Sequence, residues 1–285
     1  MKTIAINGTS GFLGSQICKY FANKYHIVKI KREDYLIPAS QLSEKLQGVD
    51  IIINLAGERI SPFMSRRKRK RVYDSRISTT KNLVDALNLL IDRPSLFVSF
   101  SAIGIYDFEH HHKEDSMFLN TDFLAFLCKD WEFNASFVKG TKVLTVRTGI
   151  VLSSEGGLLQ TALKMLKIPF GLYFGKGAQP LSFIHIDDFL RAMEFCIEHD
   201  LDGIVNFVGS KPCSYYEFME AVCTERGILK MISLPSIFVK LALRKQSTML
   251  LKGQYVLPGV LLDEGFQFQY AEILDAINHL MTSNK

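Results

Sequence analysis

The chain has 285 residues, of which 47% are hydrophobic and 22% charged, and its formal net charge is +5 at pH 7. This size suits one large domain, or a main domain with a smaller partner, and the composition is that of an ordinary globular protein. No apolar run is long enough to span a bilayer, and the five scattered cysteines include no CxxC pair, so we exclude a membrane-spanning chain, a disulfide framework and a zinc-binding cysteine cluster.

The N-terminal segment and the cysteines together indicate a cytoplasmic protein. The chain runs directly into an apolar strand at Thr3, so we expect no signal peptide. An odd number of scattered cysteines is typical of reduced thiols in a reducing compartment.

The positive charge comes from one block, Arg66 to Arg71, in which all six residues are basic. Removing these six from the 34 basic residues leaves 28 against 29 acidic ones. The block could form a phosphate-binding face or a nucleic-acid patch, or it could be the solvated start of a helix. We favour the solvated helix and expect no nucleic-acid partner, because no aromatic residues interleave the block.

The first fourteen residues give the most specific motif. Residues 3–7 read as a short buried strand, a GxxGxxG turn follows, and residues 15–25 read as an amphipathic helix. In such a turn Gly8 would adopt a positive φ, Gly11 would let a pyrophosphate approach the backbone, and Gly14 would let the helix pack close to the strand. Unpaired N–H groups at the helix start would then face the phosphates. We therefore predict dinucleotide binding by Gly8, Thr9, Ser10, Gly11, Phe12, Leu13 and Gly14.

The end of the second predicted strand, residues 27–30, should select the cofactor. An acidic residue here accepts hydrogen bonds from the ribose 2′-OH of NAD, whereas an arginine accommodates the 2′-phosphate of NADP. Aligning the strand ends places Arg32 at this position, with Lys31 beside it, and leaves Glu33 and Asp34 as the competing reading. We predict NADP in preference to NAD, because a cation gives a ribose hydroxyl no acceptor.

The rest of the chain alternates strands with helices as far as Gly209. We expect strands at 49–55, 96–101, 142–147 and 204–208, and helices at 38–47, 65–90, 123–137, 158–166 and from Asp187 or Asp188, as N-cap, to 198. This alternation predicts an α/β fold with a doubly wound parallel sheet. After Gly209 the chain becomes mainly helical, with amphipathic helices at 234–243 and 271–281, which marks a smaller C-terminal part.

Several other polar or aromatic features allow both a functional and a purely structural interpretation. Leu55, Ala56, Gly57 and Glu58 follow the third strand and should line the cofactor groove, because ligands bind at the carboxyl ends of parallel strands. The run from His110 to His112 could bind a metal, but three adjacent histidines cannot face one ion from a regular element, so we expect a polar exposed loop and predict no metal site. Trp131 is expected in the core.

Motifs along the whole chain resemble one branch of the extended short-chain dehydrogenase/reductase superfamily. The GxxGxxG spacing is similar to that of the nucleoside-diphosphate-sugar epimerase group. The remaining motifs resemble epimerase-family proteins with a small C-terminal domain of unknown function, DUF1731. They are Asn54-Leu55-Ala56-Gly57-Glu58, Asp74-Ser75-Arg76-Ile77, Ser101-Ala102-Ile103-Gly104 with Tyr106, Phe123-Leu124-Ala125 with Cys128, Asp130-Trp131-Glu132, Arg147-Thr148-Gly149-Ile150-Val151-Leu152, Ser182-Phe183-Ile184-His185-Ile186-Asp187-Asp188, Leu257-Pro258 and Gly265-Phe266-Gln267-Phe268.

This resemblance implies an NADP-binding Rossmann-like domain at residues 1–152, completed by about 180–209. A smaller substrate or lid part would comprise 153–179 and 210–285, with the DUF1731-like tail at about 233–282. The implied activity is that of an NADP(H)-dependent oxidoreductase or epimerase-like protein acting on a small carbonyl or sugar-nucleotide substrate. Homodimers are common in the superfamily, so a homodimer is one expectation. We expect further cofactor contacts within the strand ends and matched motifs, from Arg76, Ser99, Phe100, Thr148 and Gly149.

The chain departs from the superfamily at its catalytic pair. Active members use Tyr-x-x-x-Lys, in which the lysine lowers the tyrosine pKa so that the phenol can transfer a proton. No such pair occurs between Ser101 and Arg147. Leu124 and Cys128 stand at the matching helix positions, or Phe123 and Leu127 if the match is shifted by one residue.

Three other residues are candidates for the chemistry. Ser101 would hold the substrate oxygen, Tyr106 is the best substitute acid or base, and His185 is the other titratable candidate. Tyr106 could equally be a packing tyrosine, and for His185 a structural role is favoured. Two functions therefore remain: an enzyme with altered acid–base chemistry, or an NADP(H)-binding sensor that does not turn the nucleotide over.

Overall fold

The computed structural model describes residues 1–61, 63–166 and 170–282. These residues form two compact units. The first unit comprises Met1–Ile105, Thr121–Arg147 and Met193–Val205. The second comprises Tyr106–Asn120, Thr148–Ala192 and Asn206–Lys285. The chain therefore passes repeatedly between the units, and helix α6 begins in the second and ends in the first.

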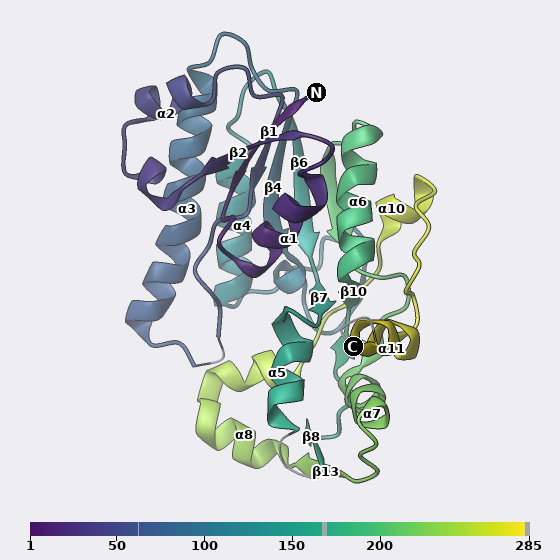
Figure 1. Ribbon diagram of the computed structural model, residues 1–285. Coiled ribbons are helices and arrows are strands. Elements are labelled where there is room, and N and C mark those ends of the chain that lie inside the picture. The colour runs from purple at the N-terminus through teal and green to yellow at the C-terminus, as the bar shows by residue number, and fades with distance from the viewer. Residues whose placement is uncertain (62, 167–169, 283–285) are drawn as a thin grey trace. The chain divides into compact units, whose positions relative to one another are not determined.

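The first unit contains the strand–helix alternation predicted from the sequence (Figure 1). Its elements are β1 (Thr3–Asn7), α1 (Phe12–Phe21), β2 (His26–Ile30), η1 (Arg32–Tyr35), α2 (Ala39–Lys45), β3 (Ile51–Asn54), α3 (Arg66–Asn88), β4 (Leu96–Ala102), η2 (Ile103–Ile105), α4 (Phe123–Ala135), β6 (Lys142–Thr148), the end of α6 (Ile186–Glu198) and β11 (Gly203–Phe207).

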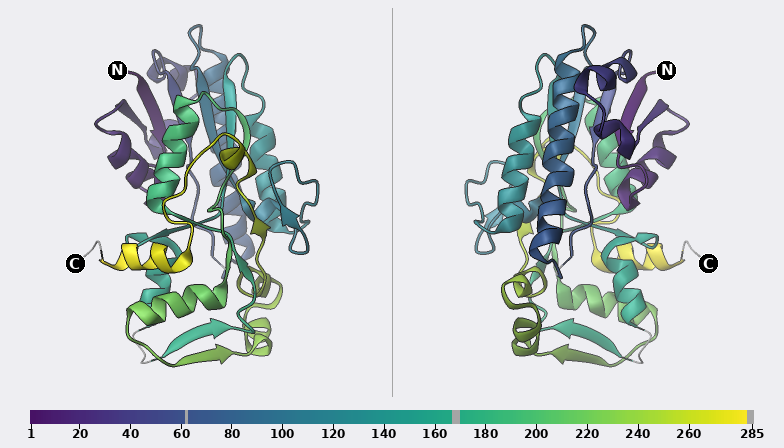
Figure 2. Two further views of the ribbon diagram at one scale, coloured as in Figure 1. Left: turned by 90° about the vertical axis from the view of Figure 1, so that its right-hand side faces the viewer. Right: turned by 90° about the vertical axis from the view of Figure 1, so that its left-hand side faces the viewer.

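A six-stranded sheet in the order β11-β6-β4-β3-β1-β2 forms the centre of this unit. β1 pairs in parallel with β2 on one side and with β3 on the other, and β3 pairs in parallel with β4. Helices α3 and α4 lie side by side on one face, and α1 lies with the C-terminal half of α6 on the other (Figures 1 and 2). The predicted doubly wound α/β fold is confirmed. The strand order reverses between β1 and β3, and such a switch point is where open α/β sheets bind ligands.

Burial of the strands on both faces explains their sequences. All four residues of β3, Ile51 to Asn54, are buried, as are the last four of β1. Such continuous apolar runs are typical of parallel strands covered by helices on both sides. Trp131 of α4 is 6% exposed and donates its indole N–H to Thr80 at 2.9 Å, which confirms its core position.

The second unit contains short strand pairs among helices. Its elements are β5 (His111–His112), β7 (Ile150–Ser153), α5 (Gly157–Met165), β8 (Gly171–Phe174), β9 (Pro180–Leu181), β10 (Phe183–His185), the start of α6, β12 (Cys213–Ser214), α7 (Tyr215–Glu225), β13 (Met231–Leu234), α8 (Ser236–Leu243), η3 (Arg244–Ser247), α9 (Thr248–Leu251), β14 (Tyr255–Val256), α10 (Gly259–Asp263) and α11 (Ile273–Thr282). The chain after Gly209 is mainly helical, as expected. The sequence did not predict the pairs β8–β13 and β5–β14, because each joins segments far apart in the chain.

The expectation of an exposed histidine loop is wrong for His112. β5 pairs in parallel with β14, and this pairing buries His112 to 1% exposure. Its ring stacks on Tyr106 at 4.7 Å between centroids, and its Nδ1 lies 2.8 Å from the Ser116 hydroxyl. The strand pairing is a tertiary event, so the polar local sequence gave no sign of it.

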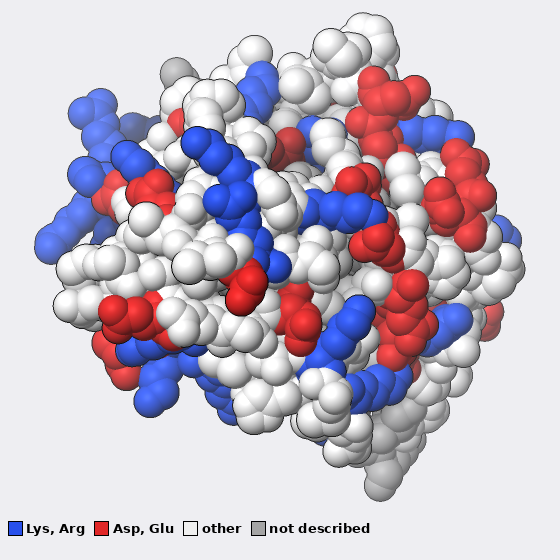
Figure 3. Space-filling model, turned by 90° about the horizontal axis from the view of Figure 1, so that it is seen from above, with Lys and Arg blue, Asp and Glu red and all other residues white. Residues whose placement is uncertain are grey.

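The basic block forms the first turns of α3, the helix that the sequence predicts at 65–90. Ser65 caps this helix through its hydroxyl, and Lys70 pairs with Asp74 one turn later at 2.6 Å. Figure 3 draws the molecule from above, the side away from the start of α3 in Figure 1, and on this face Lys and Arg side chains are interspersed with Asp and Glu. Within the described ranges, no helix has both the length and the apolar character needed to cross a membrane.

Candidate functional site

The glycine turn has the geometry that the GxxGxxG motif predicts. Gly8 adopts φ +67°, a left-handed conformation that glycine tolerates best. A Cβ at Gly14 would lie 2.2 Å from the Gly8 carbonyl oxygen, so any side chain there would separate α1 from the turn. A Cβ at Gly11 would meet only that same oxygen, at 3.2 Å. The turn therefore leaves no space for a side chain at Gly14, where it packs against α1, but leaves space for a ligand beside Gly11.

The N-terminus of α1 is suited to an anion. Gly11 is its N-cap and offers no side chain to accept the first N–H groups, and the first turn holds no acidic residue. Ser10 and Gly11 are exposed, while Thr9, Phe12 and Leu13 are half-buried. An uncapped helix start with partial positive charge binds phosphate favourably. The residues present thus fit the pyrophosphate of a dinucleotide.

Asn7 holds the two strand ends of the switch point together, and sequence reasoning missed it. Its Oδ1 accepts the N–H groups of Leu55 and Ala56 at 2.6 and 2.7 Å, and its Nδ2 donates to Asn54 at 2.6 Å. Asn54 donates in turn to Thr80 at 2.8 Å. The signal available in the sequence was that both apolar strands, β1 and β3, end in asparagine.

At the end of β2, the acidic residues are engaged and the basic ones are exposed. Asp34 is buried, and burial alone would raise its pKa, but Lys45 and the N–H of Lys31 outweigh burial and lower the pKa of this carboxyl. Glu33 lies 3.8 Å from the ammonium of Lys31, and both side chains are exposed. Arg32 is exposed as well. This arrangement favours the cationic reading of the strand end over the acidic one.

Glu58 lies within a group of cations that follows β3. It pairs with Lys68 and, at 3.4 Å, with Arg71. The hydrogen bond from Lys68, together with the charges of Arg71 and Arg32, lowers the pKa of the Glu58 carboxyl. The basic block therefore contributes two residues to the neighbourhood of Arg32, where a 2′-phosphate is expected.

Arg76 packs behind the loop after β3. Its guanidinium donates to the carbonyl oxygens of Glu58 and Val72 at 3.0 and 3.1 Å and lies over the Trp131 ring. Burial lowers the pKa of Arg76 to about 10. A Cβ at Gly57 would lie 2.6 Å from the Arg76 guanidinium carbon, so this glycine makes room for the arginine.

Ser101, at the end of β4, belongs to a buried ionic network. Its hydroxyl donates to Glu132 Oε1 at 2.6 Å, and Arg147 binds both carboxylate oxygens of Glu132 at 2.9 and 2.8 Å. Since its proton is committed to Glu132, Ser101 can accept a hydrogen bond but cannot also donate one to a substrate oxygen. Earlier on β4, Ser99 and Phe100 are 1% and 4% exposed. Sequence reasoning did not assign Glu132 or Arg147 to the site.

The helix positions of the superfamily's catalytic pair lie beside this network. Leu124 faces Gly104, where a glycine Cβ would come within 3.6 Å of the leucine Cβ. Cys128 is 4% exposed, and burial raises the pKa of its thiol to about 11. Neither side chain can exchange a proton near neutral pH.

Thr148, which belongs to the second unit, is the last residue of β6, and Gly149 follows it. The Thr148 hydroxyl is buried and has no hydrogen-bond partner in the described part of the chain. A Cβ at Gly149 would lie 2.4 Å from the Ser182 carbonyl oxygen, so this position must be glycine for β7 to approach. Buried hydroxyls are normally bonded, and Thr148 is therefore suited to a ligand contact.

Tyr106 is fully buried within the second unit. Its hydroxyl donates to Asn206 Oδ1 at 2.9 Å, and Asn206 in turn donates to the Leu257 carbonyl at 3.2 Å. The ring stacks on His112. This geometry is that of a packing tyrosine with a bonded hydroxyl, and the catalytic role of Tyr106 stays a prediction.

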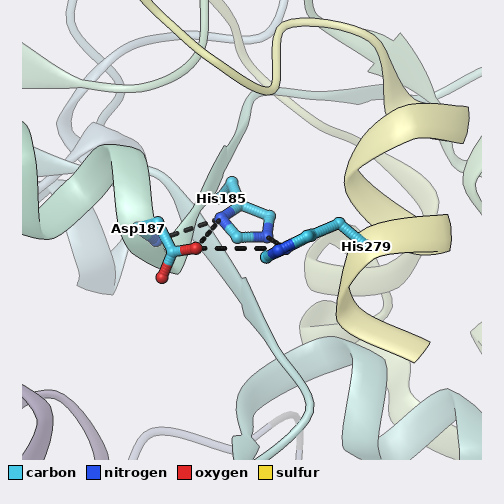
Figure 4. Close-up of side chains that lie close together, drawn as sticks. All are labelled: His185, Asp187 and His279. Carbon is cyan, nitrogen blue, oxygen red and sulfur yellow. Dashed lines mark hydrogen bonds and ion pairs between the residues drawn. The ribbon is translucent and has the colours of Figure 1, made fainter. Parts of the chain in front are cut away.

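His185 lies between Asp187 and His279 in the second unit (Figure 4). The N–H of Asp187 donates to its Nδ1 at 3.0 Å, and its Nε2 lies 3.1 Å from Nδ1 of His279. Burial, and then the charge of His279, lowers the pKa of His185 to about 3. The expected N-cap at Asp187 or Asp188 is wrong, because α6 begins at Ile186 and the His185 ring itself caps this end.

These three side chains offer ligand atoms within 4.8 Å of one another, which suggests a metal. The hydrogen bonds argue otherwise. Because Nδ1 of His185 accepts a backbone N–H, the hydrogen of the neutral ring must be on Nε2, where it points at His279. A metal on Nε2 would require that hydrogen to move to Nδ1, against the N–H of Asp187. The cluster is a hydrogen-bond chain with fixed tautomers.

Comparison with known proteins gives consistent matches. The model of the NAD dependent epimerase/dehydratase family matches residues 4–123, and that of the domain of unknown function DUF1731 matches residues 234–280. An epimerase family protein of Staphylococcus saprophyticus is 30% identical over 303 residues, covering 99% of this chain and 100% of that protein. One of Mycobacterium leprae is 31% identical and covers 98% and 95%.

A solved structure with the same fold is that of the human epimerase family protein SDR39U1 (isoform 2) with NADPH. It has a TM-score of 0.88 and 26% identity, covering 98% of this chain and 99% of that chain. The chain therefore belongs to the NAD-dependent epimerase/dehydratase family and carries a C-terminal DUF1731 domain, which confirms the resemblance that its motifs indicated.

Proposed function

We propose that the protein binds NADP(H) and uses it in an oxidoreductase or epimerase-like reaction on a small carbonyl or sugar-nucleotide substrate. The observation that carries the cofactor is the switch point, where an uncapped helix start and an open Gly11 follow β1. Exposed Arg32, with Lys68 and Arg71 nearby, favours the 2′-phosphate of NADP over the bare ribose of NAD. The human relative crystallised with NADPH supports the same choice.

A calorimetric titration with NADPH and, separately, NADH tests the cofactor. Arg32→Ala should weaken NADPH binding about 10- to 100-fold, because a charge-assisted bond to phosphate contributes about 1.5–3 kcal/mol, and should leave NADH binding unchanged. Arg66→Ala removes another exposed arginine, at the start of α3, and serves as the matched control. Equal weak binding of both nucleotides, unchanged by Arg32→Ala, would mean that the glycine turn is only architecture.

The reacting groups are a separate proposal. Ser101, Tyr106 and His185 remain the candidates, with Ser101 accepting rather than donating a hydrogen bond. NADPH consumption should occur with some carbonyl or sugar-nucleotide substrate. Tyr106→Phe should lower kcat in a protein that is still folded at the assay temperature, although loss of the hydrogen bond to Asn206 should also lower the unfolding midpoint. Turnover that Tyr106→Phe leaves unaffected would remove this tyrosine from the mechanism.

The non-catalytic alternative has a specific observation in its favour. The hydroxyls of Ser101 and Tyr106 and both ring nitrogens of His185 are engaged in internal hydrogen bonds. A sensor needs the nucleotide pocket but no free acid or base. This reading predicts a partner protein whose recovery in pulldowns depends on NADPH, and identical partner sets with and without NADPH would exclude it.

We also propose the domain roles, the compartment and the oligomeric state that the sequence predicts. Residues 1–152, completed by about 180–209, would bind the cofactor, and 153–179 with 210–285 would bind the substrate. The five cysteines are free, which supports a reducing compartment such as the cytoplasm.

Phe126 and Phe133 of α4 are 56% and 62% exposed, which supports a homodimer through this helix. Analytical ultracentrifugation of a Phe133→Lys variant would test the dimer.

A further inference from the structure

The outward face of helix α8, in the second unit, carries large apolar side chains. Ile237, Phe238 and Leu241 are 57%, 58% and 69% exposed. Val239 and Leu243 are buried and attach the helix to the unit. At about 100° per residue, these two buried residues lie on one side of α8 and Leu241 lies on the opposite side. The three exposed residues therefore face away from the core of the unit, at whose edge α8 lies (Figures 1 and 2).

Ile237, Phe238 and Leu241 form one continuous surface, which we call the α8 patch. Leu241 stands four positions after Ile237 and three after Phe238, and residues at these spacings are neighbours on a helix. Single exposed apolar residues are normal on a protein surface, whereas adjacent ones mark an interaction site. The α8 patch therefore predicts a partner that buries it.

Two basic residues border the α8 patch. Lys240 and Arg244 are exposed, and each stands three positions after a residue of the patch, Ile237 and Leu241 respectively. They are also four positions apart, so both lie along the same border. Within residues 1–61, 63–166 and 170–282, neither of them forms an ion pair with a carboxylate. Their positive charge is therefore available to an anionic partner.

The sequence around α8 is basic and contains no acidic residue. Residues 226–262 include six basic residues and no aspartate or glutamate, although the chain has 29 acidic residues. One of the six, Lys252, is paired with Glu109 at 3.3 Å. A second copy of this chain would bring the same positive charge to the α8 patch, so the charges oppose self-association through it. They favour a partner with a negative surface.

An anionic lipid bilayer offers both features that this face of α8 requires. Its headgroup layer carries negative charge, and an apolar layer lies directly beneath it. A helix with large apolar side chains on one face and Lys or Arg beside them lies in the plane of the bilayer, with its apolar face about 5–10 Å inside the headgroup boundary. An acidic protein would match the charge, but it would also need an apolar surface between its acidic groups. The lipid surface is therefore the simpler match.

We propose that the second unit binds reversibly to the surface of an anionic lipid bilayer through α8. The α8 patch enters the boundary between headgroups and acyl chains, while Lys240 and Arg244 bind anionic groups of the lipids. Such a contact lies on the bilayer and does not cross it. The proposal goes beyond the NADP(H)-dependent reaction and does not depend on it, because none of these residues belongs to the glycine turn or the switch point.

The test is co-sedimentation of the protein with sucrose-loaded vesicles. One set consists of phosphatidylcholine alone, and the other contains about 30% phosphatidylserine, both at about 0.15 M salt. The wild type should sediment with the anionic vesicles and remain in the supernatant with the neutral ones. Raising the salt concentration to about 0.5 M should weaken binding, because salt screens exposed cations.

Two double variants separate the apolar from the electrostatic contribution. Phe238→Ser with Leu241→Ser should weaken the partition constant about 100-fold, because each large apolar side chain contributes about tenfold when it is buried. Lys240→Gln with Arg244→Gln should weaken it about 25-fold, at about fivefold for each cation near the lipid surface. All four positions are exposed, so the thermal unfolding midpoints should not change.

Each double variant has a matched control elsewhere in the chain. Leu89→Ser with Ile91→Ser replaces two apolar residues that are 57% and 98% exposed. Arg66→Gln with Arg67→Gln removes two exposed cations of the basic block. Both controls should partition onto the vesicles as the wild type does.

A tryptophan placed in the α8 patch reports insertion directly. Trp131, the only tryptophan of the chain, is buried, so its emission should not respond to lipid. In the Phe238→Trp variant, the emission should shift to shorter wavelength with anionic vesicles and not with phosphatidylcholine alone.

Several results would overturn the proposal. The wild type could fail to sediment with anionic vesicles at about 1 mM lipid, or it could bind neutral vesicles equally well. Phe238→Ser with Leu241→Ser could partition like the wild type, which would mean that no apolar contact forms. Arg66→Gln with Arg67→Gln could lose as much binding as Lys240→Gln with Arg244→Gln, which would move the contact away from α8. A surface that binds an acidic protein instead would give the first of these results.

The cofactor proposal is tested separately. The α8 variants should bind NADPH as the wild type does, because they leave the glycine turn and Arg32 unchanged. Loss of lipid binding with intact NADPH binding would therefore overturn only the lipid contact, and the reverse result would overturn only the cofactor site.

Discussion

Lowering the pH should destabilise the protein through the buried ring of His185. Both of its nitrogens are engaged, Nδ1 by the N–H of Asp187 at 3.0 Å and Nε2 by His279 at 3.1 Å. Burial lowers the pKa of this ring from its ordinary 6.5 to about 3. The folded protein therefore keeps His185 neutral over a pH range in which the unfolded chain takes up a proton at this residue.

The size of the effect follows from proton linkage. Between pH 6.5 and about 3 the unfolded state binds one proton more than the folded state, so the free energy of unfolding falls as the pH falls. At about pH 7.5 both states are neutral and the effect is absent. At about pH 5 the unfolded pKa lies about 1.5 units above the pH, and at about 1.4 kcal/mol per unit His185 costs about 2 kcal/mol.

The assay is denaturant unfolding at about pH 7.5 and pH 5 for the wild type and His185→Asn. Asparagine keeps an acceptor for the N–H of Asp187 but does not titrate. On acidification the wild type should lose about 2 kcal/mol more than the variant. His112, whose pKa burial also lowers, is present in both proteins and is not bonded to His185, so its contribution cancels in the difference. Asp187, whose pKa burial raises, lies 3.7 Å from the His185 ring, so any change in its titration is part of the measured difference.

The control is His199→Asn, at an exposed histidine next to the end of α6. Between about pH 7.5 and about pH 5 this variant should lose as much stability as the wild type. If His185→Asn loses as much stability on acidification as the wild type, His185 is not held neutral in the folded protein. The hydrogen-bond chain drawn in Figure 4 would then have the wrong tautomers.

Three further substitutions test individual contacts. Gly14→Ala places a methyl group 2.2 Å from the Gly8 carbonyl oxygen and should cost about 2 kcal/mol or more in urea unfolding; a neutral result would show that α1 shifts freely. Glu132→Ala leaves Arg147 buried without its carboxylate and should cost about 3–5 kcal/mol, measured the same way, whereas a loss below about 1 kcal/mol would mean that water replaces the partner. Arg244→Gly relieves a residue held at φ 50° and should raise the free energy of unfolding by about 1 kcal/mol, and destabilisation would show that the arginine side chain outweighs the backbone strain.

Local sequence patterns were sufficient to predict the frame of the protein. The strand, glycine turn and helix at the N-terminus form where they were expected, because φ at Gly8 and the space at Gly14 are local backbone constraints. The parallel sheet follows from apolar runs such as Ile51 to Asn54, which need cover on both faces. Hydrophobic periodicity and glycine geometry act over a few residues, so a single sequence reveals them.

Only the tertiary structure decided what the candidate catalytic groups are bonded to. Ser101 donates to Glu132, 31 positions away, and His185 meets His279, 94 positions away. Tyr106 finds Asn206 at a separation of 100 residues. A hydroxyl or an imidazole is available for chemistry only if the folded protein leaves it without an internal hydrogen-bond partner. That partner comes from a distant part of the chain and is set by the packing of the whole fold. Local periodicity and motif spacing therefore do not reveal it.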